Sequence, residues 1–248
     1  MLKPHAPPNS PLTPPSPPRL WALIPCAGSG SRAGSDGPKQ YQALAGQALV
    51  RHTLAAFAGV ARVHHTLVVV AADDAFFGRS DESILIAHCG GTTRASSVFN
   101  GLNHLLTLGA DASDWVLVHD AARCLVTPAQ INTLIDACTP DSVGGLLAHK
   151  LPDTLKREVN GRVAATLDRS DKWLAQTPQM FRLGALRAAL LQAGDQVTDE
   201  ASAMEAMGLQ PLLVPGSAQN FKVTYPDDFA LAEAVLLARQ RGQTGAKK

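Results

Sequence analysis

Glycines and cations gather in one stretch near the start of this sequence. Residues 25–41 read PCAGSGSRAGSDGPKQY, and they include four glycines together with Arg32 and Lys39. Glycine lets backbone N–H groups approach a ligand closely, and the two cations can neutralise phosphate charge. A loop of this kind at the end of a strand is suited to a triphosphate. A tight turn without a ligand is the simpler interpretation, but two cations among four glycines argue against it.

Two known classes of glycine loop fit this stretch poorly. Residues 28–33, GSGSRA, satisfy the dinucleotide pattern G-x-G-x-x-G/A, but Pro38 interrupts the helix that should follow. A dinucleotide site also needs an acidic residue at the end of the second strand, but here two alanines separate the second apolar run from Asp73. A Walker A loop requires Gly-Lys-Ser/Thr, whereas Lys39 lies between proline and glutamine. These mismatches disfavour a dehydrogenase and exclude a P-loop nucleotide triphosphatase.

A second group of charged residues ends a later apolar run. Residues 115–119 read WVLVH, and Asp120 and Arg123 follow them. A carboxylate at a strand end can hold Mg²⁺ together with phosphate oxygens. The alternative is an ion pair between Asp120 and Arg123 at the surface, which would contribute little to stability. His119 is expected to be packed and hydrogen-bonded, and we assign it no chemistry.

Short apolar runs separated by helical patterns must position these residues. The runs lie at 20–24, 66–71, 84–87, 115–119 and 143–148. In one helical pattern, Val98, Leu102 and Leu105 recur on a single face. Alternating strands and helices predict an α/β fold: a Rossmann-like, mainly parallel sheet with helices on both faces. Ligands of such sheets bind beyond the carboxyl ends of the strands, where the glycine loop and Asp120 fall.

Two segments differ from this core. Eight of the 17 prolines fall within residues 1–18, which predicts a disordered Pro-rich tail over residues 1–19 ahead of one domain over residues 20–242. The alternative function for this tail is to serve as a ligand for a domain that binds proline-rich segments. Residues 149–170 alternate polar and apolar side chains around Asn160-Gly161, which predicts a protruding β-hairpin arm. Because its flanks are polar, we expect the arm to pack on a partner chain.

Composition excludes several classes of function. The 22 Lys and Arg against 21 Asp and Glu give a net charge of +1, which offers no electrostatic footprint for nucleic acid. No apolar run approaches the length of a membrane span, and the first residues lack the apolar core of a secretory signal. The four cysteines show no zinc-ligand spacing and are expected to be free thiols of a cytoplasmic protein.

The order of motifs resembles the cytidylyltransferases of isoprenoid biosynthesis. The glycine loop ending in Pro-Lys-Gln-Tyr carries the first likeness, because sugar and molybdenum-cofactor nucleotidyltransferases usually lack that ending. Five further motifs follow in the family's order: GGTTRASSV at 90–98, HDAAR at 119–123, TPQ at 177–179, TDEAS at 198–202 and NFKVT at 220–224. Cys124 replaces the family's usual proline, which affects loop rigidity rather than the charged groups. The likeness runs from Leu20 to about Leu236.

The resemblance implies a nucleotidyltransferase that transfers CMP from CTP to 2-C-methyl-D-erythritol 4-phosphate, as a homodimer with Mg²⁺. The acceptor phosphate is already anionic, so no general base is required. The implied catalytic residues are Arg32, Lys39, Lys222 and Arg169. The implied nucleotide-binding residues are Ala27, Gly28, Gly30, Ser97 and Ala121, with Arg94 in support. The implied acceptor-binding residues are Asp120, Arg123, Thr154, Arg169, Thr177, Thr198 and Lys222, and Asp120 is also the metal ligand.

Several of these assignments depend on the local structure around the residue. Thr154 and Arg169 would reach the partner's site through the arm of residues 149–170. Thr198 could cap a helix instead of, or as well as, binding the acceptor. Lys222 is expected on a short strand, where its apolar neighbours would turn it into a site. Two other functions stay open: a cytidylyltransferase for another polyol phosphate such as ribitol 5-phosphate, and a noncatalytic nucleotide-binding module.

Overall fold

The computed structural model describes residues 17–28, 37–78, 80 and 83–245 of the chain. Residues 1–16 of the predicted tail lie outside the described residues, as do Gly30 and Arg32 of the glycine loop. Across the described part, no helix combines the length and the apolar character that crossing a membrane requires.

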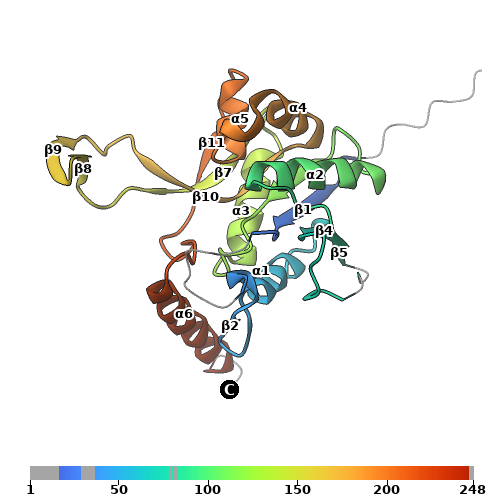
Figure 1. Cartoon of the computed structure of the whole chain (residues 1–248), viewed down its shortest axis with the longest axis horizontal. Coiled ribbons are helices and arrows are strands. Elements are labelled where there is room, and N and C mark those ends of the chain that lie inside the picture. The colour runs from blue at the N-terminus through green and yellow to red at the C-terminus, as the bar shows by residue number, and fades with distance from the viewer. Residues whose placement is uncertain (1–16, 29–36, 79, 81–82, 246–248) are drawn as a thin grey trace, which may run out of the picture.

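A mainly parallel sheet forms the centre of the protein (Figure 1). Its order is β11-β7-β10-β6-β1-β4-β5. The strands are β1 (Leu20–Pro25), β4 (Val63–Val69), β5 (Ile84–Ala87), β6 (Trp115–Val118), β7 (Gly144–Lys150), β10 (Trp173–Arg182) and β11 (Leu212–Pro215). All neighbouring pairs are parallel except those of β10, which runs antiparallel to both β6 and β7. The predicted Rossmann-like α/β fold is confirmed.

Helices cover both faces of this sheet because its strands alternate their side chains between two cores. On β1, Ala22 and Ile24 pack with α1 (Leu49–Ala58) and α3 (Pro128–Cys138). Trp21 and Leu23 point the other way, toward α2 (Arg94–Thr107), α4 (Leu183–Ala193) and α5 (Glu200–Ala206). The long α6 (Pro226–Gly245) packs on a third, smaller core beside the short pair β2 (Ala43–Leu44) and β3 (Gln47–Ala48). These layers leave the strand ends open to a ligand.

The arm projects from the body as predicted (Figure 1). Strands β8 (Leu155–Val159) and β9 (Arg162–Leu167) pair antiparallel around a tight turn. Asn160 and Gly161 take φ values of 52° and 74°, the positive φ pair that a two-residue type I′ turn requires. Nearly every residue of both strands is exposed, so the arm buries neither of its faces within this chain.

The structure contains a central strand that was not predicted and lacks a strand that was. Strand β10 lies at the centre of the sheet although Pro178 interrupts its backbone donors, and its register with β7 is irregular between Ala175 and Gln179. The strand expected around Lys222 is not formed. That segment is irregular because it joins the body by single contacts, such as the Val223 N–H bonded to the Ala122 carbonyl at 2.9 Å, and not by a ladder.

Candidate active site

A cavity of about 450 Å³ lies at the carboxyl end of the parallel strands. The loop after β1, the start of α2, the loop after β6 and the segment before α6 meet around it. Its lining residues are Pro25, Cys26, Ala27, Gly28, Lys39, Gln40, Gly91, Thr92, Thr93, Arg94, Ser97, Asp120, Ala121, Ala122 and Lys222. Residues far apart in sequence therefore share one site, at the edge that the fold class predicts.

Side chains of the glycine loop hold its backbone in the cavity wall. Buried Gln40 donates from Nε2 to the carbonyl of Cys26 at 3.0 Å and to that of Gly28 at 2.8 Å. Lys39 begins a 3₁₀ turn (Lys39–Tyr41) and donates from Nζ to the Val223 carbonyl at 2.7 Å. The loop is thus tied both to itself and to the C-terminal part of the domain.

The loop before α2 packs closely against the glycine loop. A Cβ on Gly90 would lie 2.3 Å from the Cβ of Ala27, so this approach requires glycine. Ser97 accepts a hydrogen bond from the Gly91 N–H at 3.0 Å, and its hydroxyl donates to the Thr93 carbonyl at 2.9 Å. Thr93 caps α2 by accepting from the Ser96 N–H. Ser97 therefore shapes the wall in which it lies.

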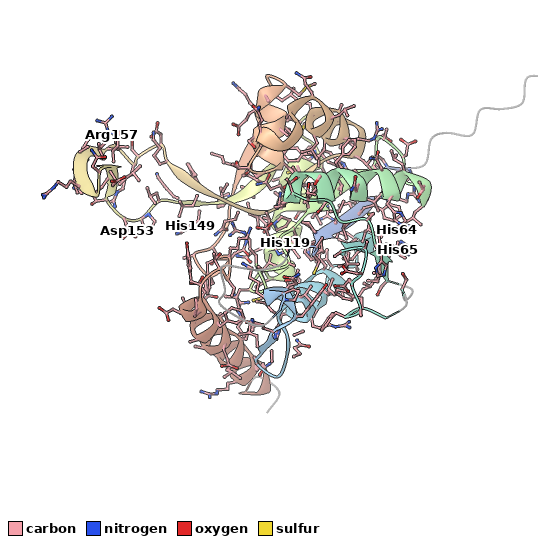
Figure 2. The ribbon with its side chains drawn as sticks, viewed as in Figure 1. His64, His65, His119, His149, Asp153 and Arg157 are labelled. Carbon is pink, nitrogen blue, oxygen red and sulfur yellow. The ribbon has the colours of Figure 1, made fainter. Side chains whose placement is uncertain are left out.

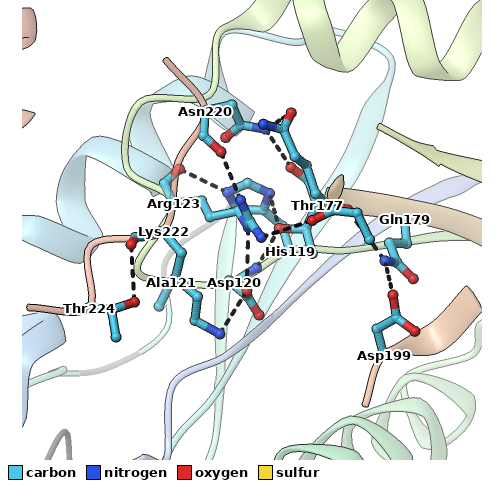
Figure 3. A network of polar contacts seen from close by, with 12 residues as sticks. His119, Asp120, Ala121, Arg123, Thr177, Gln179, Asp199, Asn220, Lys222 and Thr224 are labelled. Carbon is cyan, nitrogen blue, oxygen red and sulfur yellow. Dashed lines mark hydrogen bonds and ion pairs between the residues drawn. The ribbon is translucent and has the colours of Figure 1, made fainter. Parts of the chain in front are cut away.

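Asp120 is the centre of a buried ionic network (Figure 3). Its Oδ1 accepts from Arg94 Nε at 2.8 Å, while its Oδ2 lies 3.0 Å from Lys222 Nζ and 3.5 Å from Arg123 Nε. Burial alone would raise the pKa of the Asp120 carboxyl, but the charges of Arg94, Lys222 and Arg123 outweigh burial and hold that pKa well below its usual range. Asp120 is thus fully ionised at neutral pH, and its pair with Arg123 is internal rather than at the surface.

Glu200 extends this network away from the cavity. Its carboxylate accepts from Arg94 Nη1 at 2.6 Å and from Arg94 Nη2 at 3.0 Å, which makes the pair bidentate. The Glu200 side chain is 1% exposed. Arg94 is therefore a partly buried bridge between two carboxylates, with 26% of its side chain exposed.

His119 supports the Asp120 turn and does not face the cavity as a base. Figure 3 shows its ring between Thr177 and Arg123. Nε2 lies 3.1 Å from the Arg123 carbonyl, which can only accept, so Nε2 carries the proton and Nδ1 accepts from the Thr177 hydroxyl at 3.0 Å. The Thr177 oxygen in turn accepts from the Asp120 N–H at 3.0 Å. Burial lowers the pKa of His119 to about 4, so the ring is neutral, packed and hydrogen-bonded as expected.

The residues predicted to hold the acceptor divide among three places: the cavity edge, the arm and the segment before α5. Asp120, Arg123, Thr177 and Lys222 lie together at the cavity edge (Figure 3). Arg123 also donates to the carbonyls of Asn220 at 2.8 Å and of Ala175 at 3.2 Å, so it ties β10 to the segment before α6.

Thr154 and Arg169 lie on the arm, far from His119 and the cavity. Figure 2 marks the arm by its neighbours Asp153 and Arg157. Thr154 and Arg169 are both exposed, and Arg169 donates from Nη1 to the Pro152 carbonyl within the arm. Thr198 is exposed just before α5. The helix cap expected of Thr198 is wrong, because Asp199 accepts from the Ser202 N–H and caps α5.

Two residues that position this site carried no prediction. Gln40 is part of the Pro-Lys-Gln-Tyr ending and Glu200 is part of TDEAS, so the motifs contained both. Their types gave no further signal, because a polar residue that bonds a backbone carbonyl or a distant arginine looks like a surface residue in the sequence.

Comparison with known proteins agrees with this geometry. Residues 20–238 match the profile of the family described as 2-C-methyl-D-erythritol 4-phosphate cytidylyltransferase. The chain belongs to this family. A cytidylyltransferase of this name from Burkholderia vietnamiensis is 54% identical over 229 residues, covering 89% of this chain and 97% of its own. A crystal structure titled 4-diphosphocytidyl-2C-methyl-D-erythritol synthase superposes with a TM-score of 0.78 at 40% identity, over 89% of this chain and 99% of that one.

One relative is longer. The bifunctional enzyme IspD/IspF of Albidiferax ferrireducens is 69% identical over 234 residues, which cover 93% of this chain but only 56% of that protein. The chain thus spans about half the length of this relative, and it corresponds to the cytidylyltransferase family's part of it. Membership makes the chain a nucleotidyltransferase enzyme, as the motifs imply.

Proposed function

We propose that this protein transfers CMP from CTP to 2-C-methyl-D-erythritol 4-phosphate and releases pyrophosphate. Family membership supports both substrates, and the observation that carries the proposal is the cavity that Lys39, Arg94, Asp120 and Lys222 line together. The charges of Lys39, Lys222 and Arg94 exceed those of Asp120 and of Glu200 behind it, and this excess of cations favours polyphosphate anions at this position. The products would be 4-diphosphocytidyl-2-C-methylerythritol and pyrophosphate, in isoprenoid biosynthesis.

The reaction needs positioning and charge neutralisation rather than a general base. An oxygen of the acceptor phosphate attacks the α-phosphorus of CTP in line, and the bond from that phosphorus to the bridging oxygen breaks. The bond's electron pair leaves with pyrophosphate. Because the attacking phosphate is anionic at neutral pH, no proton must be removed. This fits the neutral, buried His119, which has both ring nitrogens engaged.

We assign the two halves of the reaction to different groups of residues. Ala27, Gly28, Gly30, Ser97 and Ala121 bind the nucleotide, while Arg32 and Lys39 neutralise charge on the α-phosphate and leaving group. Lys222, Arg123, Thr177 and Thr198 hold the acceptor. The position of Lys222, 3.0 Å from Asp120 and 37% exposed, supports its role, because its ammonium can turn from the carboxylate to a phosphate.

Asp120 suits Mg²⁺ only as one ligand among phosphate oxygens. Across the residues that the structure describes, no three His, Cys, Asp or Glu side chains form a metal site by themselves. Mg²⁺ is commonly held by one or two carboxylates and substrate phosphates, so a single Asp120 fits that mode. The ion would neutralise triphosphate charge when bound. Displacement of Lys222 from Oδ2 would free one carboxylate oxygen for it.

We propose that the arm makes the protein a homodimer and completes the partner's site. Thr154 lies just before β8 and Arg169 just after β9; both are exposed, and neither lines the cavity of its own chain. Val163 and Leu167 of the arm are 66% and 39% exposed, an apolar surface that a twofold partner would cover. Sedimentation analysis should give the mass of a dimer, and deletion of residues 151–171 should give a monomer. The four free thiols support a reducing compartment, the cytoplasm.

Pyrophosphate release tests the function directly. The assay combines CTP and Mg²⁺ with 2-C-methyl-D-erythritol 4-phosphate or ribitol 5-phosphate in parallel. Fast release with the first acceptor alone supports the proposal. Preference for ribitol 5-phosphate would reassign the acceptor, and CTP binding without release with either would indicate a noncatalytic nucleotide-binding module.

A further inference from the structure

Glu200 is a buried charged residue to which the reaction assigns no role. It is the first residue of α5, it is 0% exposed, and both of its carboxylate oxygens bind one arginine. A fully buried carboxylate is costly unless a partner satisfies it, so a purely structural helix start would not require one here. What Glu200 binds therefore indicates what it does.

The partner of Glu200 is a residue of the cavity wall. Arg94 begins α2, lines the cavity and donates from Nε to Asp120 at 2.8 Å. Its guanidinium is thus held along one edge by Asp120 and at its other nitrogens by Glu200. The planar fork fixes the orientation of the group as well as its charge.

Glu200 is itself held rigidly, which makes it an effective anchor. Asp199 caps α5, and the Ala201 N–H donates to Gln179 Oε1 at 2.7 Å. Gln179 Nε2 donates back to Asp199 at 2.8 Å, a contact visible in Figure 3. Since Gln179 belongs to the central strand β10, the start of α5 cannot shift without disturbing the sheet.

The charges show why this anchor matters to the cavity. Glu200 offsets the charge of Arg94, so Asp120 is left to balance the charges of Lys222 and Arg123. Without Glu200, the guanidinium would be free to rotate and to pair wholly with Asp120. We propose that Glu200 is a positioning residue that acts through Arg94 to set the geometry and charge of the nucleotide cavity. The proposal rests on CTP being the ligand of that cavity.

A double-mutant cycle tests this directly. The variants are Glu200→Gln, Arg94→Gln and the two combined, with Glu205→Gln as the matched control on the exposed side of the same helix. CTP affinity is measured by calorimetry without acceptor, and kcat and KM by pyrophosphate release. Glu200→Gln should lower kcat/KM for CTP roughly 10–100-fold, the scale for residues that orient primary ligands. Glu205→Gln should match wild type.

The decisive quantity is additivity. If Glu200 acts through Arg94, the double variant should be no worse than Arg94→Gln alone. Losses that multiply would overturn the proposal, as would wild-type CTP affinity and kcat/KM in folded Glu200→Gln. Should that variant fail to fold, Glu200→Asp, which keeps the charge on a shorter side chain, carries the same cycle and should retain partial activity. Wild-type protein that neither binds CTP nor releases pyrophosphate would instead refute the proposed function, and this proposal with it.

Discussion

The cavity and the arm use charged residues in opposite ways. At the cavity, Asp120 and Glu200 are buried, Arg94 and Arg123 are partly buried, and each group is fixed by an ion pair or hydrogen bond. On the arm, the charged side chains lie along two exposed strands, where ion pairs contribute little order. The cavity is therefore organised by one chain, whereas the charges of the arm can define a site only against a second surface.

Removing a cation of the glycine loop should have the largest effect. Lys39→Ala and Arg32→Ala should each lower turnover roughly 10²–10³-fold, the scale for loss of one electrostatic contact to a transition state. Arg62→Ala is the control. Arg62 lies just before β4, at the amino ends of the parallel strands and so opposite the cavity, and it pairs with exposed Asp136. Pyrophosphate release gives the readout, and turnover near that of wild type in either variant would show that the glycine loop does not bind the triphosphate.

Neutralising Asp120 should have the next largest effect. Asp120→Asn leaves Arg94, Arg123 and Lys222 without their shared anion, so activity should fall roughly 10–100-fold and half-maximal activity should require more Mg²⁺. The free energy of unfolding should fall by about 3 kcal/mol, as for a broken buried ion pair. Asp136→Asn, at an exposed position, should leave the activity, the Mg²⁺ requirement and the free energy of unfolding unchanged. An unchanged Mg²⁺ titration would remove Asp120 from the metal site.

Mixing two inactive variants would test the contrast between the regions. Lys39→Ala and Arg169→Ala homodimers should both be nearly inactive, because each site lacks one cation. Co-refolding equal amounts makes about half of the dimers mixed, and each mixed dimer carries one intact site, so activity should return to roughly a quarter of wild type. Each variant refolded alone is the control. No recovery, with mixed dimers demonstrated, would mean that Arg169 serves its own chain or no site.

Thiol reactivity should give the smallest difference. Burial raises the pKa of Cys26, Cys124 and Cys138 to about 12, although Cys26 lines the cavity. Burial also raises the pKa of Cys89, but this thiol is partly exposed, so at pH 8 it should react with a disulfide reagent before the other three, and peptide mapping should identify it. Fast modification of Cys26 instead would indicate that the cavity wall opens in solution.

Periodicity and turn chemistry predicted most of the fold. The apolar runs became β1, β4, β5, β6 and β7, and Asn160-Gly161 formed the hairpin turn. Strand β10 escaped prediction because Pro178 argues locally against a central strand, and neighbouring strands override that preference.

The sequence predicted the residues that lie in the motifs and carry charge into the site. It did not predict the contacts between different motifs that hold those residues in place. Asp120 and Lys222 could be chosen from the sequence, and the structure brings them within 3.0 Å. The bond between Glu200 and Arg94 joins residues 106 positions apart, and no local pattern encodes such a pairing.

The link between Lys39 and Val223 has a consequence for synthesis of the chain. The glycine loop leaves the ribosome before the rest of the site. Its residue Lys39, however, bonds the carbonyl of Val223, 184 residues further along the chain, and Asp120 pairs with the neighbouring residue Lys222. Contacts of such long sequence separation form late, because the intervening chain must already be ordered. A nascent chain that ends before residue 222 can pair β1, β4, β5 and β6, yet it holds an unfinished cavity. The growing polypeptide therefore gains its nucleotide site only after Lys222 and Val223 have left the ribosome.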